Sequence, residues 1–258
     1  MELTRHRILH ARDLFVELLA REMKLRYERS RLGMIWAVLN PLTQIAIFTF
    51  VFDSMIHLQI PRYPLFVFTG LLAWNWFREG LMASVGAITN NRELVRQAGF
   101  PIGVLPIVAI TVPLIDLLAA LPALFIFQLA SGGRPTLAIL ALPALLALQF
   151  LFLLGIGFVL ASVHVTFRDV HHLLGVGLMM LFYLTPVFYT PDMVPESARA
   201  IYALSPITHL ISFYRQILID GVAPDVWGLL VMALVGALLL PIGWFAFARA
   251  RHAFVEEL

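Results

Sequence analysis

The sequence contains no cysteine and few charged residues for its length. Only 13% of its 258 residues are charged, whereas about a quarter are charged in a typical soluble domain. The lack of cysteine excludes disulfides, thiolate metal sites and cysteine nucleophiles. The phosphate-loop motif G-x-x-x-x-G-K-[ST] is missing, as are H-E-x-x-H and G-x-S-x-G. The sequence therefore offers no recognisable catalytic site and no nucleotide site of the phosphate-loop kind, and no basic stripe suited to nucleic acid.

Long apolar runs are what the sequence has instead, since 60% of its residues are hydrophobic. A helix that crosses a bilayer needs about 20 apolar residues, and six runs meet or approach that length. They cover residues 35–56, 65–88, 102–130, 137–163, 173–189 and 226–248. We therefore predict an all-α membrane protein with six transmembrane helices.

The distribution of arginine and lysine indicates the orientation of these spans. Cytoplasmic segments carry an excess of basic residues, and most of the 18 basic residues fall on cytoplasmic segments if the N-terminus is cytoplasmic and six spans follow. A seventh span over residues 200–219 would move Arg249 and Arg251 outside. We therefore predict six spans with both termini in the cytoplasm.

The stretch of about residues 190–224 then has to lie on the external side without crossing. Pro191, Pro195 and Pro206 are expected to break a continuous helix there. Its apolar residues favour short re-entrant helices that dip part-way into the bilayer, which are tolerated where protein or a water-filled cavity covers the backbone. An ordinary surface loop is the alternative.

The N-terminal segment, residues 1–33, has the pattern of an amphipathic helix. One side carries apolar residues at helical spacing: Leu14, Phe15, Leu18, Leu19, Met23 and Tyr27. The opposite side carries Asp13, Glu17, Arg21, Lys24, Glu28 and Arg31. We predict a helix on the cytoplasmic membrane surface, ended by Gly33 and followed at Trp36 by the six-span domain of residues 34–258. This charged start is not a cleavable signal peptide.

Two short connections are predicted on the cytoplasmic side. In residues 90–103, Arg92–Arg96 can form a short helix that ends before Gly99 and Pro101; docking on a cytoplasmic partner and a solvated connector fit it equally well. The other connection, residues 164–172, holds three histidines near Asp169. Nothing in the sequence supplies the convergent geometry of a metal site, so we predict no metal and expect Arg168-Asp169 to cap or bridge helix ends.

Four charged residues lie inside predicted spans, where charge is costly and marks a functional or locking role. Arg78 and Glu79 are in the second span beside Trp74 and Trp76, Asp116 is midway along the third, and Asp53 is near the outer end of the first. We expect Arg78 to pair with Asp116 or Asp53. A fixed ion pair between helices and a substrate contact are both compatible with this placement.

Prolines and aromatic residues add two further expectations. Pro106, Pro113 and Pro122 should kink or break the third span. Aromatic residues gather near the external ends of the spans, where they form either an interfacial belt or a track on which sugars stack; they include Tyr183, Phe188, Tyr189 and Tyr202.

Several motifs together resemble the permeases of type-2 ABC transporters, in the branch that exports O-antigen, capsular polysaccharide or teichoic acid. They are RYERSRLG at 26–33 followed by Trp36, Leu39 and Pro41, then Phe100-Pro101, FRDV at 167–170, TPVFY at 185–189, and Arg215. The resemblance covers nearly the whole chain. Two departures are Ser205-Pro206, where Asn-Pro is common, and the charged pair Arg78-Glu79.

The resemblance implies a homodimer in the bacterial cytoplasmic (inner) membrane, powered by two separate ATPase subunits that bind ATP and Mg²⁺, with no cofactor in this chain and a lipid-linked polysaccharide as substrate. Candidate residues that couple to the ATPase are Arg26, Tyr27, Arg29, Arg92, Glu93, Leu94, Arg96, Phe100, Arg168 and Asp169. Candidate residues of the substrate pathway or gate are Trp74, Trp76, Arg78, Glu79, Tyr183, Phe188, Tyr189, Tyr202 and Arg215.

Three other functions remain open at this point. One is a type-2 ABC permease for a drug or small lipid. Another is a membrane-embedded transferase that uses His164, His171 or Asp169. The third is a secondary transporter driven through Arg78, Glu79 and Asp116.

Overall fold

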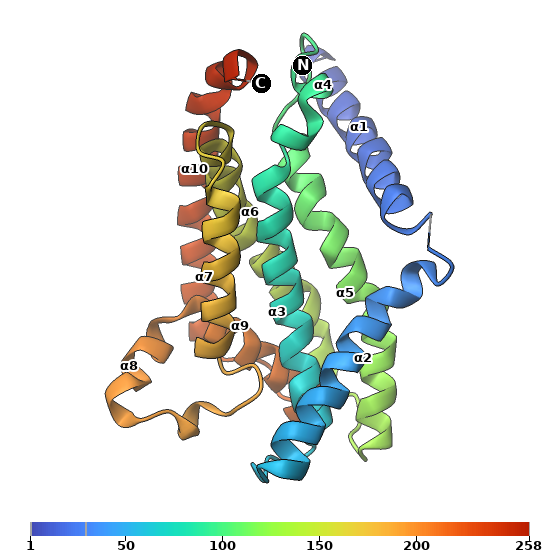
Figure 1. The fold of residues 1–258 in the computed structure, drawn as a ribbon, viewed down its shortest axis with the longest axis vertical. Helices are drawn as coiled ribbons and strands as arrows, with labels where there is room; N and C mark the ends of the chain where they lie inside the picture. The colour runs from blue at the N-terminus through green and yellow to red at the C-terminus, as the bar shows by residue number, and fades with distance from the viewer. Residues whose placement is uncertain (1, 29, 258) are drawn as a thin grey trace.

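The computed structural model describes residues 2–28 and 30–257, and the regular secondary structure of this part of the chain is all helical (Figure 1). Its α-helices are α1 Glu2–Tyr27, α2 Trp36–Phe48, α3 Tyr63–Gly86, α4 Arg92–Val95, α5 Val104–Ala130, α6 Leu142–Thr166, α7 Val170–Leu184, α8 Glu196–Leu204, α9 Pro206–Arg215 and α10 Val226–Glu257. Short 3-10 segments join several of them, and π-helical turns extend α2 over Thr49–Met55 and α9 over Gln216–Asp220.

Each predicted apolar run contains a helix in the structure, but the predicted fifth run, residues 173–189, extends too far because α7 ends at Leu184. Four continuous helical stretches are long and apolar enough to cross a membrane: Gly33–Met55, Val104–Ala130, Leu137–Thr166 and Val226–Arg251. Helix α7 is apolar but shorter. Helix α3 has 24 residues, a sufficient length, but is less apolar because it carries Asn75, Arg78 and Glu79. The helical class is confirmed.

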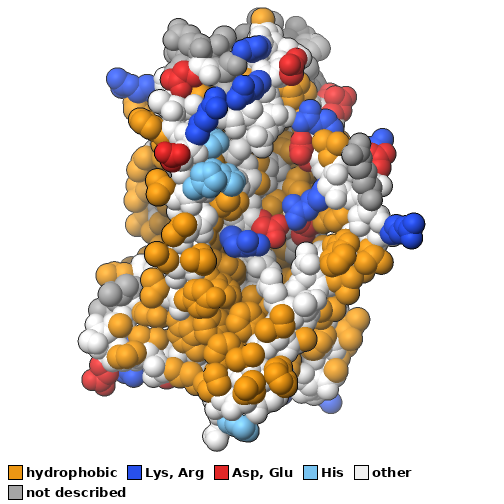
Figure 2. Space-filling view, viewed as in Figure 1, with side chains coloured by type: hydrophobic (Ala, Val, Ile, Leu, Met, Phe, Trp, Pro, Cys, Tyr) orange, Lys and Arg blue, Asp and Glu red, His pale blue; other side chains and the backbone are white. Residues whose placement is uncertain are grey.

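The long helices alternate in direction. Helix α4, the α6–α7 connection and both ends of the chain lie at one end of the bundle, and the α2–α3 and α5–α6 connections lie at the other (Figure 1). Figure 2 shows that charged side chains gather mostly on the half of this face nearer the termini, whereas the other half is largely hydrophobic. This is the arrangement expected from the distribution of basic residues in the sequence.

Helix α1 runs obliquely beside α5 (Figure 1). Of its predicted apolar face, Leu18 is buried and Leu14, Phe15, Leu19 and Met23 pack against the core. The predicted end of this helix is wrong: α1 stops at Tyr27, well before Gly33. Gly33 has a left-handed φ of 50° and begins the 3-10 turn that leads into α2, so the glycine serves the start of the next helix.

Helix α3 is the centre of the bundle and packs against α2, α5, α6, α7 and α9. Beside it, α6 and α10 are in close contact at Gly155 and Gly243: a Cβ on Gly243 would lie 2.1 Å from the Gly155 carbonyl oxygen. Small residues permit such close backbone approach between membrane helices.

Proline breaks some predicted helices and not others. In α5 the helix is not broken, because it continues from Val104 to Ala130 through Pro113 and Pro122. In the external region the prediction is confirmed: α8 starts directly after Pro195, and Pro206 is the first residue of α9. Proline suits the first helical position because its missing N–H has no partner there in any case.

Helix α9 packs against α3 and α6 within the bundle. Its apolar residues Ile207, Leu210, Ile211 and Phe213 are buried. The hydroxyl of Tyr214 donates to Oε1 of Gln149 on α6 at 2.8 Å, and Nε2 of Gln149 donates to the Ala73 carbonyl on α3 at 3.0 Å. A buried hydrogen-bonded chain thus ties α9 to the middle of two long helices.

Candidate functional site

A polar groove lies between α1, α2, α3 and α5. Its volume is about 550 Å³, and it is open on one side. Its lining includes polar side chains Arg26, Tyr27, Asn40, Thr43, Gln44, Asn75, Arg78, Glu79 and Asp116, together with Trp36 and Trp76. Such a concentration of polar groups among apolar helices is costly unless it is used or internally paired.

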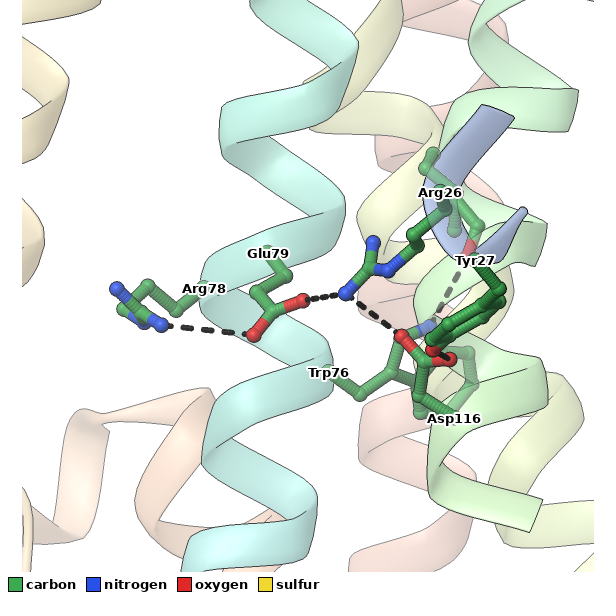
Figure 3. A network of polar contacts seen from close by, with 7 residues as sticks. Arg26, Tyr27, Trp76, Arg78, Glu79 and Asp116 are labelled. Atoms are coloured by element: carbon green, nitrogen blue, oxygen red, sulfur yellow. Dashed lines mark hydrogen bonds and ion pairs between the residues drawn. The ribbon is translucent and has the colours of Figure 1, made fainter. Parts of the chain in front are cut away.

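Arg26 holds the polar cluster of this groove together (Figure 3). Its Nη2 atom lies 2.7 Å from Oε2 of Glu79 and 2.7 Å from Oδ2 of Asp116. The three residues come from α1, α3 and α5, and their side chains are partly buried. One guanidinium therefore joins two carboxylates from different helices, which would otherwise repel each other.

Tyr27, the neighbour of Arg26, binds the other carboxylate oxygen of Asp116. Its hydroxyl donates to Oδ1, so both carboxylate oxygens are occupied by adjacent residues of α1. Burial raises the pKa of the Tyr27 phenol to about 12, and the hydrogen bond to Asp116 acts in the same direction. The phenol therefore stays protonated at neutral pH and acts as a donor.

Arg78 does not make the ion pair predicted for it. Its Nη2 atom is 3.5 Å from Oε1 of the adjacent Glu79, and Figure 3 shows it on the side of α3 that faces away from Arg26. Within the described residues, no ion pair joins Arg78 to Asp53 or to Asp116, and Asp116 is bound by Arg26 and Tyr27 instead. The sequence analysis singled out the carboxylates Glu79 and Asp116 correctly. It did not identify their cation, Arg26, which lies in the last turn of α1.

The two tryptophans predicted for the pathway are both largely buried. The indole N–H of Trp76 donates to the Ile110 carbonyl at 3.2 Å, which fixes α3 to α5, and part of its ring lines the groove. Trp74 packs on Phe77 and on Phe182 of α7. Both rings are therefore used mainly in packing between helices, and little of either is free to contact a substrate.

The predicted external aromatic residues come together around Phe188. Its ring stacks on Phe48 and Phe52 of the first span and contacts Tyr183 and Tyr189 edge-on. The hydroxyls of Tyr189 and Tyr202 lie 2.9 Å apart. Tyr183 is 62% exposed. The sequence predicted the cluster near the external end but did not identify Phe48 and Phe52 as its base.

Arg215 is a buried cation of α9. Its Nη1 and Nη2 atoms donate to the carbonyls of Pro186 and Val187 at 2.8 and 2.7 Å. The guanidinium lies 3.4 Å from the centre of the Phe66 ring, within the range of a cation–π contact. It therefore fastens the segment after α7 onto α3 and α9, and it does not line the polar groove.

The candidate coupling residues lie in three places. Arg92, Glu93 and Arg96 are exposed on or beside α4, Leu94 is half-buried, and Phe100 is buried. Arg168 and Asp169 are exposed at the α6–α7 turn. Arg26 and Tyr27 point into the groove instead. Arg29 lies outside the described residues.

The histidine-rich turn has no metal-site geometry. Among the residues that the structure describes, no group of three histidine, cysteine, aspartate or glutamate side chains is arranged to hold a metal ion. The rings of His164 and His171 are 6.2 Å apart. Asp169 occupies the N-cap position of α7 as expected, but its side chain makes no capping hydrogen bond.

Comparison with known proteins shows the family. The family model described as ABC-2 type transporter matches residues 13–219. The chain belongs to the ABC-2 type transporter family. It is therefore a multi-pass membrane protein, in keeping with its apolar helices.

Individual relatives of this ABC-2 chain match over almost their whole length. It is 33% identical to the O-antigen export system permease protein RfbA of Myxococcus xanthus, over 96% of each chain. It is 30% identical to the protein of the same name from Klebsiella pneumoniae, over 95% of each chain. It is 24% identical to the polysialic acid transport protein KpsM of Escherichia coli, over 93% of this chain and 94% of the relative.

Proposed function

We propose that this chain is the transmembrane subunit of an ATP-driven exporter that moves a lipid-linked polysaccharide across the bacterial inner membrane. The observation that carries the proposal is the similarity, over 96% of both chains, to an O-antigen export permease. Similarity to a polysialic acid transport protein points to the same chemical class of cargo. These relatives favour a polysaccharide over a drug or a small lipid.

In this proposal the chain crosses the membrane six times. The spans are α2 with its π-helical end, α3, α5, α6, α7 and α10. The termini, α4 and the α6–α7 turn then face the cytoplasm, because they lie at one end of the bundle (Figure 1). Helices α8 and α9 form the re-entrant region at the external side, where burial of α9 supports insertion. Helix α1 lies at the cytoplasmic interface.

A separate ATPase subunit supplies the energy in this scheme and binds ATP and Mg²⁺. Exposed Arg92 and Glu93 of α4, with Arg168 and Asp169 of the α6–α7 turn, present charge at the cytoplasmic end. Charged, protruding residues of this kind suit an interface that has to be partly polar. We propose that two permease copies and two ATPase copies form the complex.

The polar groove is proposed as part of the substrate path. Amide groups of Asn40, Gln44 and Asn75 offer both donors and acceptors to sugar hydroxyls, and Trp36 is 44% exposed at its edge. The open side of the groove would be closed by a second copy of the chain.

Co-purification with the ATPase subunit tests the proposal. We expect an ATPase chain to co-purify with this permease from solubilised membranes. The double variant Arg92→Ala with Glu93→Ala should weaken that association, because it removes two exposed charges from α4 while leaving the buried Val95 in place. Asp192→Ala with Glu196→Ala at the external side is the matched control. If no ATPase is captured, or if the control weakens capture as much as the α4 variant does, the proposal is wrong.

A further inference from the structure

A separate, mostly apolar groove lies between the start of α5 and the last part of α10, at the end of the bundle that holds the termini (Figure 1). Its volume is about 280 Å³. It is lined by residues between 101 and 107 and by Trp244, Phe247, Ala248 and Arg251 of α10. Arg251 is the only charged residue of this lining, so the α5–α10 groove is apolar with a cation at one end.

The depth of this groove in the membrane follows from the length of α10. Its apolar stretch, Val226–Arg251, has 26 residues and is about 39 Å long at about 1.5 Å per residue. A bilayer with its headgroup regions is about 40–45 Å thick, so Arg251 lies at the level of the headgroups. Trp244 precedes it by about two helical turns on the same face of α10. The groove therefore runs from the headgroups into the acyl chains.

The aromatic wall of the groove is held in place by packing on its protein side. The Trp244 ring meets Phe158 edge-on at 5.3 Å and stacks on Phe247 at 6.0 Å. A Cβ on Gly103 would lie 2.8 Å from Cζ3 of this indole, so the ring lies directly on the backbone of the α5 start. Trp244 is still 51% exposed. A fixed wall with an open face is preorganised for a ligand.

An acyl chain fits this groove better than water does, because apolar cavities stay dry and this one opens toward the bilayer. Its volume is near the lower end of the range of ligand pockets, about 300–1,000 Å³, and therefore suits part of one chain and not a whole lipid. Arg251 is exposed and forms no ion pair within the described residues. Basic pockets between membrane helices on the cytoplasmic side bind anionic headgroups. Charge complementarity thus favours an anionic lipid over a zwitterionic one.

We propose that the α5–α10 groove binds an anionic phospholipid of the cytoplasmic leaflet, with one acyl chain against Trp244 and the lipid phosphate at Arg251. The proposal goes beyond the proposed function. It requires that α10 spans the membrane and ends in the cytoplasm, but it does not depend on the cargo or on the ATPase.

Native mass spectrometry of the full-length permease tests the preference for lipid charge. Phosphatidylglycerol and phosphatidylethanolamine with the same acyl chains compete for the delipidated protein. The wild type should prefer phosphatidylglycerol about fivefold, the effect of one arginine near an anionic group. Arg251→Gln should abolish this preference, and Arg251→Lys should keep it. Arg249→Gln is the matched control, because Arg249 is also exposed on α10 but does not line the groove.

Fluorescence quenching by lipids with brominated acyl chains locates the bound lipid. The signal of Trp244 is the difference between the wild type and Trp244→Phe, a change that keeps an aromatic ring against Phe158 and Phe247. Brominated phosphatidylglycerol should quench this signal at a lower lipid fraction than brominated phosphatidylethanolamine does. The signal of Trp227, which is 73% exposed at the other end of α10 and is isolated in the same way, should be quenched equally by the two lipids.

Four results would overturn the proposal. They are equal binding of both lipids by the wild type, equal loss of preference in Arg249→Gln and Arg251→Gln, equal quenching of Trp244 by both lipids, and exclusion of phosphatidylglycerol from the groove when an ATPase subunit is bound. The second would indicate diffuse surface charge, and the fourth would show that protein covers the groove. A permease that shows the lipid preference but exports no polysaccharide would count against the proposed function alone.

Discussion

Arg215 and Gly70 illustrate how single residues hold the external region. The Arg215 guanidinium fits between the Pro186 and Val187 carbonyls and the Phe66 ring. It can do so because position 70 on α3 has no side chain: a Cβ there would lie 2.8 Å from the Val187 carbonyl oxygen and 2.9 Å from Nη2 of Arg215. These contacts partner Nη1 and Nη2, whereas Nε is buried without a hydrogen-bond partner among the described residues.

Gly70→Ala should therefore destabilise the protein by about 1–3 kcal/mol, since the added methyl group meets a backbone oxygen that cannot move aside easily. Thermal unfolding of the purified protein measures this. The matched control is Gly175→Ala on α7, where nothing lies within 4 Å of the new Cβ. That change should be neutral or stabilising, because alanine is the better helix former. Equal melting temperatures for the two variants would contradict the packing described.

At this scale the sequence predicted which residues were unusual but not how they pair. Arg78, Glu79 and Asp116 stood out because charge is rare in apolar spans. Their true partner, Arg26, looked like one more basic residue on a surface helix. Two features of the sequence could have indicated the pair. Asp116 lies in an apolar span and requires a cation, and Arg26 lies just before the first span. Choosing Arg26 over Arg78 requires knowing that α1 packs against α5.

At the scale of elements, proline had different effects in different surroundings. In the external region, Pro195 and Pro206 mark the starts of α8 and α9 as predicted. Helix α5 continues through Pro113 and Pro122. When an apolar helix is packed on its neighbours, unwinding it costs more free energy than the loss of single backbone hydrogen bonds. Proline is therefore less able to end a helix there.

The packing of α9 against α3 and α6 gives a further prediction. Tyr214→Phe deletes the hydroxyl that donates to Gln149 and leaves a buried amide oxygen without its donor. We expect faster hydrogen exchange for the amides of α9, corresponding to a loss of about 1–3 kcal/mol in local stability. Exchange in α10 serves as the internal reference. Unchanged protection of α9 would show that apolar packing alone holds it.

At the scale of the whole molecule, the bias of basic residues predicted which connections share an end of the bundle, and the structure agrees (Figure 1). Hydropathy could predict the helical stretches because length and apolar composition determine them. It could not predict that α1 would fold back onto α5 or that the groove would form between four helices. Those features depend on packing between segments that are distant in the chain.

We propose that this chain conducts a polysaccharide through the membrane, driven by ATP that a separate subunit hydrolyses. The most direct measurement is uptake of a lipid-linked polysaccharide by inside-out proteoliposomes that contain the permease and its ATPase. We expect transport that needs ATP and both subunits and that persists when an uncoupler abolishes ion gradients. Transport by the permease alone, or transport that stops with the uncoupler while ATP is present, would contradict it.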